Sequence, residues 1–315
     1  MLAMLGAAAA LLFAFDAALF RTGLYRRVIE PQSYTGQAEL AMRQTGSGVL
    51  VLGDSRIAEG FSSERANSGG VSFLNAAVPG STLRCWYYLL RELDPSASRF
   101  HAIVLPFDDY EDEDGAWDWA DRVLDLRIVV LYLRFGDVWD FARSFPGGSE
   151  RFEAARGSLL RGFVFKDDVR DFLSHPFSRI EKAEKWRESG VGWVNGYQGN
   201  PGVLPSSYRP QGRGMLPQNG RYASYRKLWL GRILKRYQGS AVRVFAIRVP
   251  RGPVPEDHPP GLLPSALREF QARELTVIDP KTFTPLEKPE YFFDDLHLNS
   301  QGRKMFSQML QQVIR

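Results

Sequence analysis

Three polar residues, one near the start of the chain and two near its end, are of the types that carry out nucleophilic catalysis. Ser55 follows the apolar run 49–52 and the pair Gly53-Asp54, and Asp294 lies three residues before His297. A histidine base needs the nucleophile at one ring nitrogen and an acceptor, usually a carboxylate, at the other. Alone, each residue also fits a turn, a structural histidine or a helix cap. Together they predict a triad with Ser55 as nucleophile, His297 as base and Asp294 as its orienting carboxylate.

The segment 75–82, which reads NAAVPGST, contains a candidate oxyanion hole. Acyl transfer passes through a tetrahedral oxyanion, which preorganised N–H donors stabilise. Gly80 has no Cβ, so its backbone amide can approach a reacting oxygen closely. We expect the amides of Gly80 and Ser55 to be the two donors. Without the triad, Pro79-Gly80 would be interpreted as a simple turn.

Short apolar runs alternate with helical patterns along the chain, and these elements must position the candidate triad. Runs typical of buried parallel strands begin at Val49, Val71, His101, Ala241 and Leu275. The spacing of apolar residues predicts a helix over 82–93 and a C-terminal helix capped by Asn299 or Ser300. Alternating strands and helices indicate a doubly wound α/β domain over 48–315 with a central parallel sheet. Such sheets bind ligands at the carboxyl ends of their strands, which is where the serine and the glycine fall.

The region 115–238 departs from this alternation. It contains helical stretches separated by a long Gly/Pro-rich segment at 190–220, and such a loop is uncommon unless it is functional or mobile. We expect an insertion of helices and loops between the third and fourth strands. The pattern 226–237 has an apolar side, which we expect to pack into the core, and a basic side that could instead touch a membrane surface.

The N-terminal segment 1–22 is apolar up to Phe20 except for Asp16, and about 20 apolar residues suffice to cross a bilayer as a helix. We expect a membrane anchor or signal-anchor, joined to the α/β domain by the polar connector 23–47. A cleaved signal peptide and a buried helix are the alternatives. Basic residues follow the segment, and the positive-inside rule alone would place the main domain in the cytoplasm. A start codon assigned too late would remove this conflict.

Composition narrows the class of protein. The chain has 315 residues, 44% hydrophobic and 24% charged, which is typical of a globular protein. Its net charge of +4 comes without a dense run of Lys or Arg, so nucleic acid is not an expected partner. The single cysteine, Cys85, cannot form an internal disulfide. No metal or cofactor is expected, because the acidic run 108–115 lacks EF-hand spacing and the other histidines lack partners at metal-ligand spacing.

Three blocks of the sequence together resemble the SGNH/GDSL hydrolase superfamily. The blocks are Gly53-Asp54-Ser55, the segment 75–82 around Gly80, and Asp294-x-x-His297 followed by Leu298-Asn299-x-x-Gly302. The resemblance covers about 48–314, with the insertion outside it. It implies a flavodoxin-like, three-layer fold and esterase or acyl-transfer chemistry. By this match, the triad and oxyanion residues would take the roles given above.

One block departs from the family pattern. The family usually has Gly-x-Asn-Asp after the third strand, with the Asn donating to the oxyanion, whereas this strand ends Pro106-Phe107-Asp108-Asp109. A carboxylate at Asp108 would repel an oxyanion unless it were protonated. The hole then either keeps two backbone donors or gains another from the insertion. The departure is similar to that in membrane-anchored SGNH-like proteins that modify cell-wall or exopolysaccharides, such as the alginate O-acetylation and D-alanyl transfer proteins.

The motifs and the resemblance predict an O-acyl esterase or transferase, with acetyl as the expected group, that acts on a cell-envelope or exopolysaccharide. Ser55 would form an acyl-enzyme that water or a sugar hydroxyl resolves. We expect a periplasmic or extracellular main domain, an acylated polysaccharide or small ester as substrate, and a membrane protein as a candidate acyl donor. The candidate substrate-binding residues are Arg56, Asn75, Asp108 and Asp109. Arg56 could steer an acidic glycan or pair with the acidic loop near Asp109.

Two other classes of protein stay open at this point. A non-catalytic glycan-binding or assembly protein that keeps a degenerate SGNH fold is favoured by the departure at Asp108. A cytoplasmic lipase-like esterase is compatible with the basic residues that follow the N-terminal segment.

Overall fold

The chain divides by its internal contacts into two compact units. One comprises Met1–Glu39 and Ala120–Gly190, and the other comprises Leu40–Trp119 and Val191–Arg315. We refer to the first as the helical unit and to the second as the sheet unit. The computed structural model describes residues 2–22, 45–67, 70–107, 124–188, 197–205, 207–208, 220–250, 252–253, 265–271 and 274–314.

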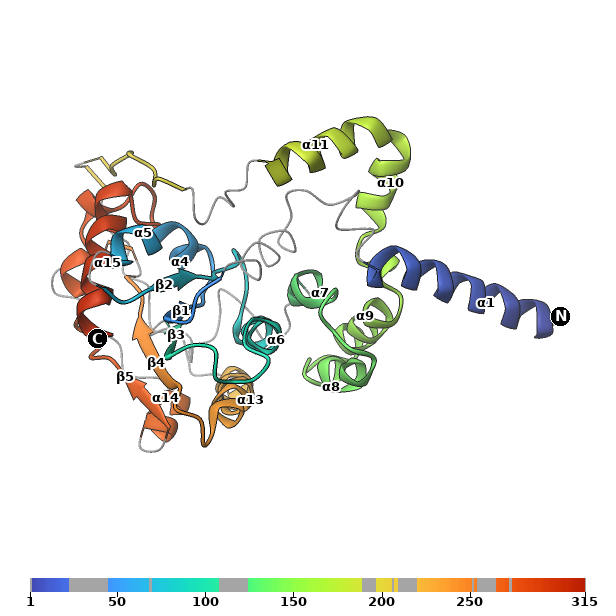
Figure 1. The fold of residues 1–315 in the computed structure, drawn as a ribbon, viewed down its shortest axis with the longest axis horizontal. Helices are drawn as coiled ribbons and strands as arrows, with labels where there is room; N and C mark the ends of the chain where they lie inside the picture. The colour runs from blue at the N-terminus through green and yellow to red at the C-terminus, as the bar shows by residue number, and fades with distance from the viewer. Residues whose placement is uncertain are drawn as a thin grey trace. The chain divides into compact units, whose positions relative to one another are not determined.

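A five-stranded sheet forms the centre of the sheet unit (Figure 1). Its strands are β1 (Val49–Val51), β2 (Phe73–Asn75), β3 (Ala102–Phe107), β4 (Arg243–Arg248) and β5 (Leu275–Val277). They lie in the order β2-β1-β3-β4-β5, and all neighbours are parallel. The α/β class and the central parallel sheet expected from the sequence are confirmed. The strand order is compatible with a flavodoxin-like fold.

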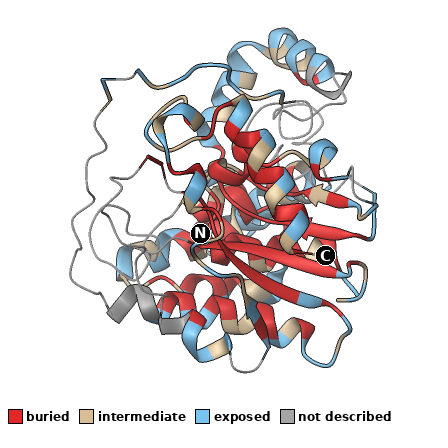
Figure 2. Cartoon of the chain, turned by 90° about the vertical axis from the view of Figure 1, so that its left-hand side faces the viewer, coloured by how far each residue is buried: buried red, intermediate tan, exposed pale blue. Residues whose placement is uncertain are grey.

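Helices cover both faces of this sheet. On one face pack α4 (Ser55–Gly60), α5 (Ser63–Ala66) and α15 (Ser300–Val313). On the other pack α6 (Leu83–Leu93), α13 (Gly220–Tyr237) and α14 (Ser265–Gln271). Strands β1 and β3 are buried along their whole length, and the strands of the sheet are largely red in Figure 2. A strand covered on both faces needs a continuous apolar run, which is the pattern in the sequence.

The two helices predicted most directly from the sequence begin where expected. Helix α6 follows Thr82, and α15 follows Asn299, whose side chain accepts hydrogen bonds from the amides of Gln301 and Gly302. This cap satisfies amides that have no partner within the helix. It also fixes the start of α15 directly after the loop that carries His297.

Helix α13 falls within the predicted insertion 115–238, but by its contacts it belongs to the sheet unit. Its apolar side is buried, namely Trp229, Leu230, Ile233 and Leu234. The Tyr225 hydroxyl donates a hydrogen bond of 2.7 Å to Thr82 Oγ1 at the start of α6. The interpretation of this segment as a core helix is confirmed, and α13 serves as the crossover that leads into β4.

The helical unit contains α1 (Leu2–Asp16), which continues as a π-helical turn over Ala17–Arg21, and short helices that follow β3 in sequence. These are α7 (Leu124–Val129), α8 (Val138–Arg143), α9 (Gly148–Leu159), α10 (Lys166–Ser174) and α11 (Pro176–Glu188), with 3-10 turns η3 (Phe135–Asp137) and η4 (Arg161–Phe163). Phe141 and Phe145 lie in its core, and their rings pack edge to face with centroids 5.3 Å apart.

Helix α1 and its extension are long and apolar enough to cross a membrane. The segment Ala3–Phe20 has a mean hydropathy of 2.0, and residues 3–15 are exposed. The C-terminal end of the segment, in contrast, contacts other residues of the helical unit. Asp16 accepts a hydrogen bond of 2.7 Å from the Gly162 amide, and the Phe20 ring stacks on Phe165 with centroids 5.6 Å apart. The segment therefore has the properties of a membrane anchor or a signal sequence, with its last turn packed against η4.

Candidate active site

Ser55 is positioned by a sharp turn between β1 and α4. Asp54 caps the helix, since its side chain accepts a hydrogen bond of 2.9 Å from the Arg56 amide. Gly53 is required here because a Cβ would lie 2.4 Å from Cγ1 of Ile57. Ser55 therefore begins α4 just beyond the carboxyl end of β1, at the edge where parallel sheets bind ligands.

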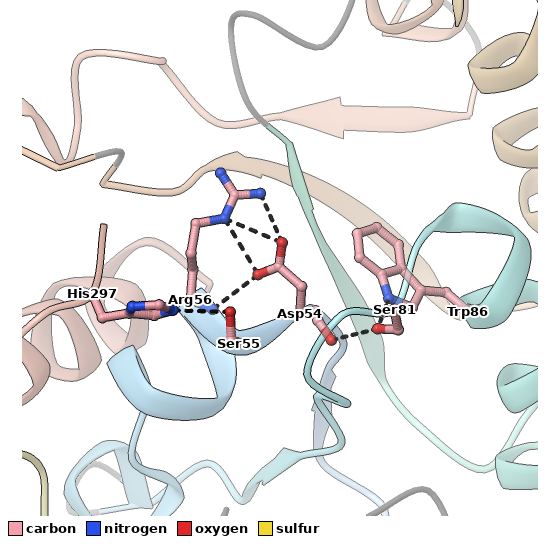
Figure 3. A network of polar contacts seen from close by, with 7 residues as sticks. Asp54, Ser55, Arg56, Ser81, Trp86 and His297 are labelled. Carbon is pink, nitrogen blue, oxygen red and sulfur yellow. Dashed lines mark hydrogen bonds and ion pairs between the residues drawn. The ribbon is translucent and has the colours of Figure 1, made fainter. Parts of the chain in front are cut away.

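His297 lies within hydrogen-bond distance of both other predicted triad residues, Ser55 and Asp294. Nε2 of His297 is 2.9 Å from Ser55 Oγ (Figure 3), and Nδ1 is 2.9 Å from Oδ2 of Asp294. Both distances suit a nucleophile polarised by a histidine base that a carboxylate orients. Folding brings Ser55 to His297 across 242 positions of sequence.

Asp294 holds the backbone of its own loop as well as the imidazole. Oδ1 accepts hydrogen bonds from the amides of Leu296 at 2.8 Å and His297 at 2.6 Å. Burial raises the pKa of Asp294, but the hydrogen bonds from the His297 ring and these two amides outweigh it, so the pKa lies below the ordinary aspartate value. A charged Asp294 accepts from Nδ1–H, which leaves Nε2 to accept the proton of the serine.

The loop that carries His297 is held by neighbours on several segments. The Phe293 ring stacks on the imidazole, with centroids 5.8 Å apart and planes within 13°. The Ser300 amide donates to the Asn200 carbonyl at 2.8 Å. Gly252 has a left-handed φ of 100° and approaches so closely that a Cβ would lie 2.3 Å from the Asp295 carbonyl oxygen. Fixing the base in this way preorganises its contact with the serine.

The turn that contains Gly80 is hydrogen-bonded to Gly53, which lies two residues before Ser55. Gly80 has a left-handed φ of 73°. The Val78 amide and the Ser81 hydroxyl both donate to the Gly53 carbonyl at 2.9 Å, and Trp86 Nε1 donates to Ser81 Oγ at 2.8 Å (Figure 3). Among the residues that the structure describes, none accepts a hydrogen bond from the Ser55 or Gly80 amide. With respect to these residues, both amides are available as donors, as the predicted oxyanion hole requires.

Arg56 and Asp54 form a buried ion pair beside the nucleophile (Figure 3). Arg56 Nη2 lies 3.0 Å from Asp54 Oδ2, and Nε lies 3.2 Å from the same oxygen. The guanidinium offsets the negative charge of a carboxylate adjacent to Ser55, which would otherwise oppose a developing oxyanion. Asp54 is thus one partner of Arg56, and a pair with the acidic loop stays a prediction because Asp108 and Asp109 lie outside the described residues.

Asn75 is placed inside the sheet unit and is fully buried. Its Nδ2 donates to the Phe61 carbonyl at 3.0 Å and to the Ile57 carbonyl at 3.3 Å, and its Oδ1 accepts from the Ala77 amide at 3.1 Å. The side chain therefore fastens α4 to the end of β2. This placement gives the side chain a structural role, and its expected contact with substrate stays a prediction.

Sequence reasoning missed a second polar cluster, formed by Glu59, Tyr197 and Arg303, which we call the α4 brace. Arg303 is 3% exposed, and its Nη1 donates to the carbonyls of Ala58 at 3.0 Å and Glu59 at 2.5 Å. Its guanidinium lies over the Tyr197 ring, 5.1 Å from the centroid. The Tyr197 hydroxyl donates to the Glu59 carboxylate. The brace thus connects the end of α4 to α15 and to the segment around Tyr197.

The brace perturbs the ionisation of its members. Burial lowers the pKa of Arg303 to about 10, which leaves it charged at neutral pH. Burial also raises the pKa of Glu59, an effect that the nearby His297 and Arg303 oppose. Glu59 stands four residues after Ser55 on α4, a spacing that shares one helix face and could have identified it. Tyr197 and Arg303 carry no comparable local signal.

The described residues include no group of three or more His, Cys, Asp or Glu side chains that could hold a metal ion. A scan against protein-family models and a search of curated proteins find no match. The parallel sheet by itself is compatible with many functions. Functional inference therefore depends on the site geometry and on the motifs that the sequence contains.

Proposed function

We propose that the chain is a serine-dependent esterase or O-acyltransferase of the SGNH/GDSL type. The observation that carries the proposal is the pair of 2.9 Å contacts that link Ser55 Oγ to His297 and His297 to Asp294. A nucleophile, a base and an orienting carboxylate in this order are the minimum set for acyl transfer through a covalent intermediate.

The geometry supports the following sequence of steps. Ser55 Oγ bonds to the acyl carbon of an ester while its proton passes to Nε2 of His297. The carbonyl oxygen becomes an oxyanion, which the amides of Ser55 and Gly80 would stabilise. As the C–O bond to the leaving group breaks, the imidazolium returns the proton to the departing alkoxide. Water or a sugar hydroxyl then loses its proton to His297 and attacks the acyl-enzyme, which regenerates the serine.

The substrate we propose is an O-acylated, in particular O-acetylated, polysaccharide of the cell envelope or an exopolysaccharide. Two features support this choice: the resemblance to the membrane-anchored SGNH-like proteins, and an N-terminal segment, Ala3–Phe20, that is apolar enough to anchor the chain. In this proposal the sheet unit works outside the cytoplasm, and a membrane protein supplies the acyl group if the reaction is a transfer.

Ser55→Ala tests the proposal. The full-length protein should react with a fluorophosphonate probe and release acetate from a model ester, and Ser55→Ala should lose both activities. Ser96→Ala, in an exposed turn where the Ser96 hydroxyl accepts a hydrogen bond from Ser98, is the matched control and should keep both. Equal labelling of Ser55→Ala would reject the triad. Glycan binding without ester cleavage, unaffected by Ser55→Ala, would instead favour a non-catalytic glycan-binding protein.

A further inference from the structure

The helical unit contains a pocket of about 360 Å³ whose lining residues all belong to that unit. Four of its lining side chains are apolar, namely Leu124, Leu126, Phe163 and Val164, and we call them the apolar wall. The lining also includes three cationic residues, Arg127, Arg156 and Lys166, and one carboxylate, Glu153. A pocket with an apolar wall and an excess of cations matches an amphiphilic anion.

Close packing of the helices forms this pocket. Gly157 on α9 lines it, and a Cβ at this position would lie 2.7 Å from both Leu126 Cδ2 and Val164 Cγ2. The glycine therefore lets α9 pack directly against α7 and against the residue that follows η4. Three separate segments of the unit meet at the apolar wall as a result.

Two of the cations are disposed to meet an anion. The Arg156 guanidinium lies over the Phe163 ring, 4.7 Å from its centroid, and also faces Phe152 at 5.7 Å. Arg156 and Lys166 are both exposed, and neither forms an ion pair with a residue that the structure describes. Arg127 differs, since its Nη2 lies 2.8 Å from Asp168 Oδ2. Arginine held on an aromatic face presents a planar set of donors that suits phosphate oxygens.

The pocket adjoins the attachment point of the apolar N-terminal segment. Phe163 is the neighbour of Gly162, whose amide holds Asp16. Arg161, in the same turn, donates to the Leu133 carbonyl at 2.8 Å and to the Phe20 carbonyl at 3.5 Å. If α1 lies in a bilayer, its last turn reaches the membrane surface, and the pocket is then at the level of the lipid head groups.

Aromatic side chains are exposed in the helical unit, and this favours contact of the unit with a lipid surface. Large apolar side chains are exposed at Phe135 (67%), Trp139 (60%), Phe152 (67%) and Phe177 (85%), all in the helical unit. In the sheet unit, the large hydrophobic side chains that the structure describes as exposed are Val203 and Leu228, neither of them aromatic. Aromatic residues are enriched where a protein meets the head-group region of a membrane.

We propose that this pocket binds the phosphate-bearing head group of an anionic membrane phospholipid. The phosphate would lie between Arg156 and Lys166, and the glycerol and first acyl carbons would pack on Phe163 and the leucines of the apolar wall. The inference depends on α1 being a membrane segment and is independent of the triad. Bound lipid would fix the helical unit to the bilayer surface beside its anchor.

Lipid titration of the full-length protein in non-ionic detergent micelles tests the proposal. Micelles are doped with equal mole fractions of dihexanoyl phosphatidylglycerol or dihexanoyl phosphatidylcholine, and inorganic phosphate is a third ligand. Binding is measured by calorimetry and by the shift in melting temperature. Phosphatidylglycerol should bind most tightly. The double variant Arg156→Gln/Lys166→Gln should weaken its binding at least about tenfold, equivalent to ~1.4 kcal/mol.

Two further variants make the test decisive. Arg170→Gln removes an exposed arginine on α10, which pairs with Asp167 outside the pocket, and should bind lipid like the parent protein. Glu153→Gln removes the carboxylate of the pocket and should tighten binding, so the proposal stays testable even if the double variant unfolds. Equal binding of the two lipids, inorganic phosphate binding as tightly as lipid, or no response to these variants would each overturn the proposal.

Discussion

The candidate triad and the α4 brace both include residues of helix α4, but the two clusters differ in how deeply they are buried. The triad is partly open: the side chains of His297 and Asp294 are 17% and 39% exposed. The brace is centred on Arg303, which is 3% exposed and bonds mainly to backbone carbonyls. Burying a cation is unfavourable unless hydrogen bonds and opposite charge compensate for it. In the proposed function the triad positions the reacting groups, whereas the brace stabilises the helix that begins with Ser55.

This contrast predicts opposite responses to substitution. Loss of a triad group should reduce activity with little change in stability, because its bonds lie near solvent. Loss of the Arg303 guanidinium from the brace should reduce stability first, because it leaves buried carbonyl oxygens without their donor.

Asp294→Asn should give the largest effect on activity. An asparagine can still accept from the Leu296 and His297 amides, but its Nδ2 would donate to Nδ1 and stabilise the wrong imidazole tautomer. We expect kcat/KM for a model ester to fall about 10⁴-fold, with the free energy of unfolding at neutral pH lowered only by the modest amount that the charged carboxylate contributes. Steady-state kinetics and denaturant unfolding measure the two quantities. A fall of less than tenfold would remove Asp294 from the catalytic set.

The same variant carries a pH signature. The pKa of Asp294 is lower in the folded chain than in an unfolded chain. The stability that the charged carboxylate contributes is therefore present at a pH above the ordinary aspartate pKa, and it is lost as the pH falls through the pKa of the folded state. Asp294→Asn should therefore lose less stability than the parent protein on acidification over this acidic window. An identical acid dependence in the two proteins would contradict the hydrogen-bonded, charged carboxylate.

Arg303→Met should give the opposite pattern to Asp294→Asn. Removing the guanidinium leaves the Ala58 and Glu59 carbonyls without their donor, which should destabilise the chain by about 3 kcal/mol. We expect kcat/KM per folded molecule to fall by about tenfold or less, because Ser55 stays on a loosened α4. Arg303→Lys, which keeps the charge, should recover part of the stability. Loss of activity without loss of stability would place Arg303 with the triad instead.

Local motifs account for what the sequence could predict. The strands, the Asn299 cap and the Asp294-His297 loop each follow from residues close together in sequence, and the parallel sheet then brings Ser55 to the same edge. The brace was not predictable in this way, because positions 59, 197 and 303 meet only through tertiary packing. Asn75 shows the same limit, because its motif does not predict that the side chain is buried between α4 and the end of β2. For α13, the amphipathic pattern predicted the helix but not the unit against which it packs.

Glu59→Gln should give the smallest effect and the sharpest test of the brace. Burial raises the pKa of Glu59 in the folded chain. The stability that the neutral carboxyl group contributes is therefore fully present at a pH below the ordinary pKa of 4.5, and it is lost as the pH rises through the pKa of the folded state. Glutamine does not titrate and can still accept a hydrogen bond from Tyr197. The variant should therefore match the parent protein near pH 4 and become more stable at neutral pH by up to about 1 kcal/mol.

Glu64→Gln, on the exposed part of α5, is the control and should show no such trend. The opposite result, in which Glu59→Gln becomes less stable than the parent protein as the pH rises, would contradict this prediction. It would mean that Arg303 holds the carboxylate in its charged form and outweighs the effect of burial on the pKa of Glu59.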